Sequence, residues 1–148
     1  MEQWDFLKEL ADEYQLDVTV DDIEVILTDQ KTGEHIDIYV EKYLSEDLKD
    51  TYVEYIVCFS TQHVHLENLS DVAEYVRLIL ADEVLPIEFY LQGERRFGGE
   101  IKHTDLDGLT IEFLADHYGY SVEYLSQFDY EIHSWSGKYN REQTKVSE

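Results

Sequence analysis

Three neighbouring segments decide the fold: TYVEYIVCFSTQHV (residues 51–64), LSDVAEYVRLILADE (69–83) and PIEFYL (86–91). The first and third are rich in β-branched and aromatic residues, which is typical of strands. The middle segment repeats apolar residues every three or four positions, as an amphipathic helix does. Asn68 and Asp71 mark the start of this helix in the manner of a capping box. The order predicts a helix packed on a sheet.

Upstream of these segments, the pattern predicts one helix and two strands. Apolar residues recur at helical spacing over Glu2–Tyr14, with carboxylates on the opposite side. From Asp17 to Val40 the period changes to two, and alternation over 23–27 and 36–40 predicts a hairpin around Asp29–Gly33. The short connections between these strands and the strand from Thr51 favour an antiparallel meander.

Downstream, Pro86 begins a strand that runs to Leu91, because proline is tolerated at the first residue of a strand. Residues 93–99 contain three glycines and are interpreted as a turn, followed by a strand that includes Ile101. The pair Gly98-Gly99 indicates a bulge or a close approach of another group to the backbone.

The segment LADHYGYSVEYL, residues 114–125, predicts a helix that ends at Gly119 and a short second helix capped by Ser121. It resembles the closing helix pair of lambda-repressor-like helix-turn-helix proteins. No recognition helix precedes it, and its surroundings lack the basic residues that contact phosphate. The resemblance therefore implies a local helix pair and not DNA binding. A last strand is predicted over residues 130–135.

These elements predict an α+β fold with the order α-βββ-α-ββ-αα-β. We expect a mostly antiparallel sheet of about five to six strands with helices packed on one face. A chain of 148 residues with 43% apolar residues fits one folded domain. We assign residues 1–137 to that domain and residues 138–148, which are polar, to a flexible C-terminal tail.

Charge is the outstanding bulk property: 34 Asp and Glu against 11 Lys and Arg give a net charge of −23. Such a field repels nucleic acid and anionic membranes and speeds encounter with a basic protein. We therefore expect a basic protein partner, no direct contact with nucleic acid and no membrane contact. The alternative explanation is that the charge only keeps the protein soluble.

Cys58 is the only cysteine, so an intrachain disulfide is excluded, and its place in an apolar strand suits a small buried residue. The N-terminus is charged and helical, unlike a secretory signal. We expect a cytoplasmic protein.

Strand alternation predicts a binding face opposite the helices, where tyrosines and carboxylates are interleaved. Tyrosine provides large contact area at low entropic cost, and carboxylates accept Arg and Lys side chains from a partner. A homodimer that covers this face is the alternative, as are tyrosine pairs that only stabilise the sheet. The predicted binding residues are Asp37, Tyr39, Glu41, Tyr52, Glu54, Glu88 and Tyr90.

The motif His63-Val-His65 places two imidazoles on one side of a strand, which is a weak candidate for a zinc site. Cys58, His103, His117 or His133 could complete the site, but their spacing matches no compact ligand set, so we predict no metal and no cofactor. The sequence also lacks a nucleophile elbow, a P-loop and a dinucleotide fingerprint, and we predict no catalytic residue.

These observations favour a non-catalytic, acidic interaction domain that binds and blocks a basic protein, as an immunity protein, an antitoxin or a DNA-mimic inhibitor does. The order of elements over residues 2–118 also resembles secretion-chaperone-like α+β domains. That resemblance implies an alternative function, the binding of an extended protein segment. A small metal-dependent enzyme that uses the region of His63 and His65 is a further alternative.

Overall fold

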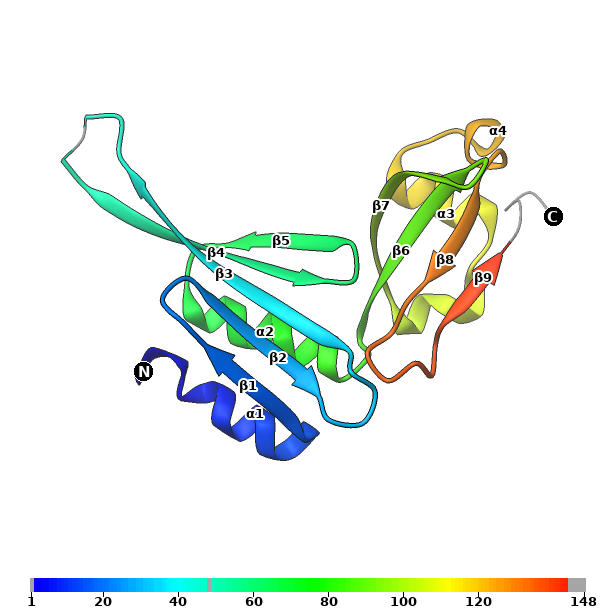
Figure 1. Ribbon diagram of the computed structural model, residues 1–148. Coiled ribbons are helices and arrows are strands. Elements are labelled where there is room, and N and C mark those ends of the chain that lie inside the picture. The colour runs from blue at the N-terminus through cyan, green and yellow to red at the C-terminus, as the bar shows by residue number, and fades with distance from the viewer. Residues whose placement is uncertain (1, 48, 144–148) are drawn as a thin grey trace. The chain divides into compact units, whose positions relative to one another are not determined.

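The computed structural model describes residues 2–47 and 49–143 (Figure 1). The chain divides into two compact units, Met1–Leu80 and Ala81–Glu148. Each unit has its own antiparallel sheet, of five strands in the first and four in the second. The predicted α+β class is confirmed. The strands are divided between two sheets, whereas the sequence predicted a single sheet of five to six strands.

Two α-helices and a short 3-10 helix belong to the first unit. The 3-10 helix η1 (Glu2–Trp4) precedes α1 (Phe6–Tyr14), so the helix predicted over residues 2–14 is present with a 3-10 first turn. Helix α2 (Leu69–Leu80) buries Val72, Val76, Ile79 and Leu80. Asn68 Oδ1 accepts a hydrogen bond from the Asp71 N–H (2.8 Å), and the Asn68 amide donates to Asp71 Oδ2 (3.0 Å). The predicted cap is confirmed.

The first sheet is an antiparallel meander in sequence order, β1-β2-β3-β4-β5. Its strands are β1 (Leu16–Val20), β2 (Glu24–Asp29), β3 (His35–Leu44), β4 (Thr51–Phe59) and β5 (Gln62–Leu66). The sequence did not predict β1 or β5 as separate strands. Gln15 takes a left-handed φ of 57° directly after α1 and turns the chain into β1. Ser60, with φ of 58°, makes the tight turn that separates β4 from β5.

Both helices of this unit pack on the same face of the first sheet. Helix α1 contacts β1 and α2, and α2 contacts β4 and β5 (Figure 1). The helix-side face is fully apolar at its centre, where Val25, Leu27, Ile36, Ile38 and Val57 are at most 1% exposed. Burial of these side chains is the main stabilising term of the unit. No described helix of the unit covers the opposite face.

The β3–β4 hairpin is longer than its neighbours. Strand β2 pairs with β3 only as far as Tyr39, and β5 pairs with β4 only from Tyr55 onward. Residues 41–44 and 51–54 therefore pair only with each other, and we call them the hairpin arm. Figure 1 shows these strand ends running past the rest of the sheet.

The second unit contains a four-stranded antiparallel sheet in the order β7-β6-β8-β9. Its elements are β6 (Val84–Leu91), β7 (Glu94–Lys102), the 3-10 helix η2 (His103–Gly108), α3 (Ile111–Tyr118), α4 (Val122–Leu125), β8 (Asp129–Ile132) and β9 (Arg141–Gln143). The turn predicted over residues 93–99 is wrong. Only Gln92 and Gly93, with φ of 52° and 82°, make the turn, and the chain pairs with β6 again from Glu94.

The C-terminal segment is partly described. Arg141–Gln143 forms β9 and pairs with β8, within the stretch that the sequence assigned to a tail. Residues 144–148 of the predicted tail lie outside the described residues.

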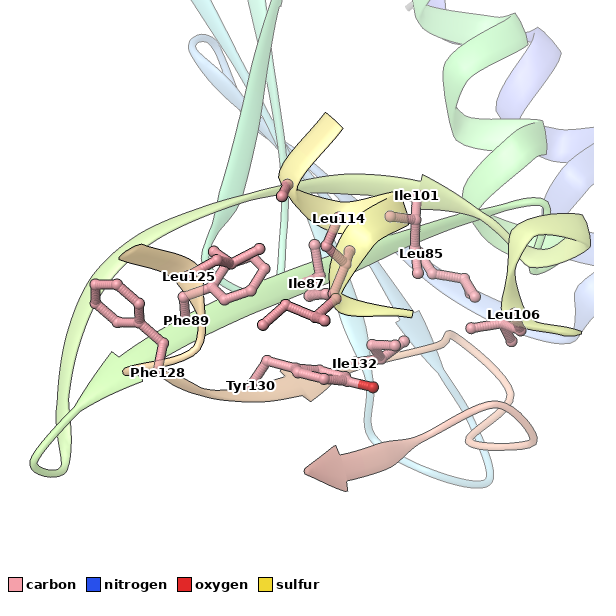
Figure 2. Close-up of a cluster of buried hydrophobic side chains, with 12 residues drawn as sticks. Leu85, Ile87, Phe89, Ile101, Leu106, Leu114, Leu125, Phe128, Tyr130 and Ile132 are labelled. Atoms are coloured by element: carbon pink, nitrogen blue, oxygen red, sulfur yellow. The ribbon is translucent and has the colours of Figure 1, made fainter. Parts of the chain in front are cut away.

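Helices α3 and α4 cover one face of the second sheet. Figure 2 shows Leu114 of α3 and Leu125 of α4 among Ile87, Phe89 and Tyr130 of the strands. Gly119 ends α3 with φ of 74°, and the Ser121 Oγ accepts from the Tyr124 N–H (3.1 Å) at the start of α4. The predicted helix pair is confirmed.

Gly99 of β7 allows α3 to approach closely. A Cβ atom at Gly99 would lie 2.6 Å from Cε1 of Tyr118, which is closer than van der Waals contact permits. The Tyr118 hydroxyl donates to the carbonyl of Glu100 (3.0 Å), so the ring is fixed over the glycine. The predicted close approach is confirmed at this glycine.

Within residues 2–47 and 49–143, no helix has the length and apolar character needed to cross a membrane.

Candidate functional site

The helix-free face of the first sheet displays a row of polar and aromatic side chains, which we call the open face. The register places Glu24 beside Tyr39, Asp37 beside Cys58 and Glu41 beside Glu54, so these side chains point to the same side. The remaining residues of the open face follow by alternation along each strand. On β2 to β5 the set is Glu24, Ile26, Thr28, His35, Asp37, Tyr39, Glu41, Tyr43, Tyr52, Glu54, Ile56, Cys58, His63 and His65.

The structure brings together most of the predicted binding residues but not all of them. Asp37, Tyr39, Glu41, Tyr52 and Glu54 lie on the open face, on β3 and β4. Glu88 and Tyr90 lie on β6, in the second sheet and the other unit, so the predicted residues do not share one sheet. Alternation correctly predicted which residues of each strand face away from the helices. It contained no information about which strands pair with one another.

Glu88 forms an ion pair with Arg95 within the second sheet. Its carboxylate accepts from Arg95 Nε, and the residue is 5% exposed. Arg96 lies near the carboxylate of Glu94 (Nη2 to Oε2, 3.5 Å). The adjacent arginines thus neutralise carboxylates of β6 and β7. Tyr90 is half-buried, and burial, followed by the charge of Glu131, raises the pKa of its hydroxyl.

Asp37 occupies the centre of the open face. Its Oδ1 atom is buried and accepts no hydrogen bond from the described residues. The charge of Asp37, followed by that of Glu24, raises the pKa of Tyr39. Burial, followed by the charge of Asp37, also raises the pKa of the half-buried Cys58 thiol, so this thiol is not an activated thiolate. The centre therefore offers one unpaired acceptor next to neutral hydroxyl and thiol groups.

The hairpin arm combines charge with an aromatic pair. Glu41 and Glu54 are direct cross-strand neighbours, an arrangement in which like charges destabilise a hairpin. The rings of Tyr43 and Tyr52, the next pair on the same face, stack with centroids 5.3 Å apart and planes at 22°. The Tyr43 hydroxyl donates to Glu41, and this bond raises the pKa of Tyr43 to about 12.

Two large side chains of the arm are exposed to solvent. Tyr52, on the open face, is 53% exposed, and Leu44, the last residue of β3, is 62% exposed on the opposite face. Large exposed side chains beside a charged patch are typical of contact surfaces.

The two predicted histidines lie on the same side of β5, with ring centroids 5.2 Å apart. His65 Nδ1 contacts the carboxylate of Glu54, and His63 is the cross-strand neighbour of Cys58. Among the residues that the structure describes, no group of three or more His, Cys, Asp and Glu side chains is arranged to hold a metal ion. In this structure His65 therefore serves as a neighbour of the arm carboxylate.

Sequence reasoning missed two residues of the open face that belong to its chemistry. Tyr43 follows Glu41 by two positions and therefore shares its face, but the predicted row stopped at Glu41. Glu24 precedes the buried Val25 in β2 and extends the row to a third strand. Continuing the alternation to the end of each strand would have found both.

The fold and this site define an acidic α+β protein with an open, tyrosine- and carboxylate-rich sheet face. Its groups accept hydrogen bonds, attract cations and stack on planar groups. Comparisons of the chain with protein-family models, with curated proteins and with solved structures gave no match.

Proposed function

We propose that this protein binds a basic protein through the open face and the hairpin arm, and that it blocks the partner's basic surface, as an immunity protein, an antitoxin or a nucleic-acid mimic does. The observation that carries the proposal is the direct pairing of Glu41 with Glu54 beside the stacked rings of Tyr43 and Tyr52.

Two carboxylates that face each other repel, and a cation placed between them relieves that repulsion. A guanidinium group fits this position because it binds carboxylates through paired N–H donors and stacks on aromatic rings. Tyr52 adds exposed aromatic contact area on the same face as the charges. The arm thus supplies both the charge and the anchoring surface that a basic partner needs.

Asp37 supports the same proposal at the centre of the sheet. Its buried Oδ1 atom accepts no hydrogen bond from the described residues, and the negative charge of the carboxylate adds to the attraction of this face for a cation. The net charge of −23 supports rapid encounter, because it steers a basic protein toward the whole molecule at low salt.

The first experiment compares partner capture by matched charge reversals. The Glu41→Lys/Glu54→Lys variant changes the arm, whereas the Glu67→Lys/Glu74→Lys variant makes the same charge change at exposed sites off the open face. Native-lysate capture with quantitative mass spectrometry should show basic proteins that the arm variant loses by about tenfold or more and the control retains. Circular dichroism should show that both variants are folded.

Salt separates this proposal from its alternatives. Capture through the open face should weaken from about 0.05 M to about 0.5 M NaCl, because screening shortens the range of the charges. Capture that is equal for both variants at all salt concentrations would contradict the proposal. Stoichiometric zinc in the untagged protein would instead favour an enzyme that uses His63 and His65.

A further inference from the structure

We propose that a basic, extended polypeptide segment binds in the groove between α1 and β1 and adds to the first sheet as an antiparallel strand beside β1. This site lies on the helix side of the sheet edge. It goes beyond the function proposed above, because it uses a different surface from the open face.

The hydrogen-bonding direction of β1 leaves one side of the strand open. Gln30 N–H donates to the Gln15 carbonyl (3.1 Å), and Asp21 N–H donates to the Glu24 carbonyl (2.9 Å), in register with the pairing of β1 and β2. Bonding residues alternate in an antiparallel pair, so the odd-numbered residues of β1 bond toward β2. The backbone groups of Val18 and Val20 consequently point away from the sheet.

β1 is an edge strand, and residues 17–20 are all exposed. Within the described part of the chain, the outward backbone groups of Val18 and Val20 have no hydrogen-bond partner. A row of unpaired N–H and C=O groups on an edge strand is a template for pairing with another strand.

An apolar groove lies next to this edge. Val18 and Val20 point to the helix side of the sheet, yet they are 37% and 39% exposed. With Leu7 and Ala11 of α1 they line a groove of about 330 Å³. An added strand would place every second side chain in this groove and cover both valines.

Charge identifies the occupant as a basic segment. Asp5, Lys8 and Asp12 line the groove from α1, and Lys8 pairs with Asp5 (Nζ to Oδ1, 3.3 Å), so Asp12 leaves the groove with a net negative charge. Asp17 lies on the other face of β1, and Asp21 and Asp22 follow the strand directly. A second copy of this chain would bring the same carboxylates and a further charge of −23 to the contact. A segment in which apolar and basic residues alternate would instead fill the groove with its apolar side chains and place its basic side chains on the other face of β1, next to Asp17.

The probe is a fluorescein-labelled peptide of four Lys-Val repeats, titrated with the full chain and followed by fluorescence anisotropy. Measurements at about 0.5 M NaCl suppress non-specific attraction to an acidic protein, because the Debye length is then only about 4 Å. Val18→Lys and Val20→Lys place a charge in the groove and should weaken binding by about tenfold or more. Thr19→Gln, on the same strand with its side chain on the other face, where the peptide lysines lie, should change affinity by less than about twofold.

Backbone methylation tests the strand addition itself. In an antiparallel addition the valine N–H groups of the peptide face β1 and the lysine N–H groups face away. N-methylation of the valines should abolish binding, whereas N-methylation of the lysines should preserve it.

Three results would overturn the inference: no binding of the peptide, equal binding by all variants, or equal loss with either methylated peptide. A dimer of the protein that Val18→Lys converts to a monomer would show that a second copy occupies the edge and would also overturn it. Glu41→Lys/Glu54→Lys should bind the peptide normally, and Val18→Lys should retain the partners captured by the open face. Failure of this inference is thus distinguishable from failure of the proposed function.

Discussion

At the scale of single residues, Tyr43 is the most strongly perturbed group of the hairpin arm. Its hydroxyl donates to the Glu41 carboxylate, and loss of the proton would place two negative charges in contact. The pKa of Tyr43 is therefore raised to about 12. The ring stays neutral over the whole physiological range and keeps its donor directed at Glu41.

We expect Glu41→Gln to lower the pKa of Tyr43 toward its ordinary value of about 10, because the charged acceptor is removed. NMR of ¹³Cζ-labelled tyrosine across pH 8–12.5, with Tyr43→Phe for assignment, measures this shift. Glu46→Gln, an exposed neighbour in the sequence, is the control. An unchanged pKa in Glu41→Gln would show that Glu41 does not hold the proton.

The same shift fixes the sign of a stability effect. The folded pKa of Tyr43 lies above the unfolded one, so the folded chain holds this proton more tightly. Any stabilisation from this group is complete below about pH 10 and is lost as the pH rises toward 12.

The sequence correctly predicted on which side of the sheet a side chain lies, because alternation along the strand alone determines it. The faces of Asp37, Tyr39 and Glu54 follow from a period of two and agree with the observed register. The prediction that Glu88 lies on the same face was wrong, because β6 pairs with β7 and β8 in the second sheet. Strand pairing depends on tertiary contacts and not on the local pattern. Periodicity within a strand carries no information about its neighbours.

At the scale of elements, the packing of α3 against β7 depends on a missing side chain. The Tyr118 ring lies over Gly99, and burial is the largest cause of its raised pKa. The ring is held by its hydrogen bond to the Glu100 carbonyl, so it has little freedom to move aside.

Gly99→Ala should destabilise the second unit by about 1–3 kcal/mol, because the new methyl group forces the Tyr118 ring outward. Gly108→Ala is the matched control, since a Cβ there meets nothing within 4 Å. The control should leave stability unchanged or raise it by up to about 1 kcal/mol. Urea unfolding followed by tryptophan fluorescence and circular dichroism measures both. Equal stability of the two variants would mean that the close approach at Gly99 is not needed.

The three glycines of residues 93–99 explain why part of β7 was predicted as a turn. Glycine is a reliable turn signal when φ is positive, as at Gly93, but Gly99 is present because a ring needs the space of a side chain. Sequence patterns do not distinguish these two uses. β1 was missed for a related reason: its turn is made by Gln15 in a left-handed conformation, which is uncommon for this residue.

At the scale of the whole molecule, repulsion among carboxylates opposes folding of both units. The chain has 34 acidic and 11 basic side chains, so most carboxylates have no cation available within the chain. Such self-repulsion destabilises compact states and is screened by salt.

We expect the thermal stability of the protein to increase with salt. From about 0.02 M to about 0.5 M NaCl, a gain of about 1 kcal/mol corresponds to a rise in Tm of about 3–5 °C for a chain of this length. Differential scanning calorimetry measures it, and choline chloride at equal ionic strength is the control for specific sodium binding. A Tm that falls with salt would indicate that ion pairs outweigh repulsion.

The α+β class and the antiparallel meander were predictable for the whole molecule because both follow from local periods and short connections. The division into two sheets was not. Only residues 81–83 separate α2 from β6, and a short connection of this kind gave no signal that a new sheet begins.

The arm has a consequence for how affinity is set. A two-stranded ribbon without further neighbours is marginally stable, so its pairing opens more easily than that of the central strands. A partner that binds the arm must supply the free energy needed to order it. Pre-organisation of the arm, for example by a substitution that only strengthens the pairing of residues 41–44 with 51–54, would therefore tighten binding without adding any contact to the partner.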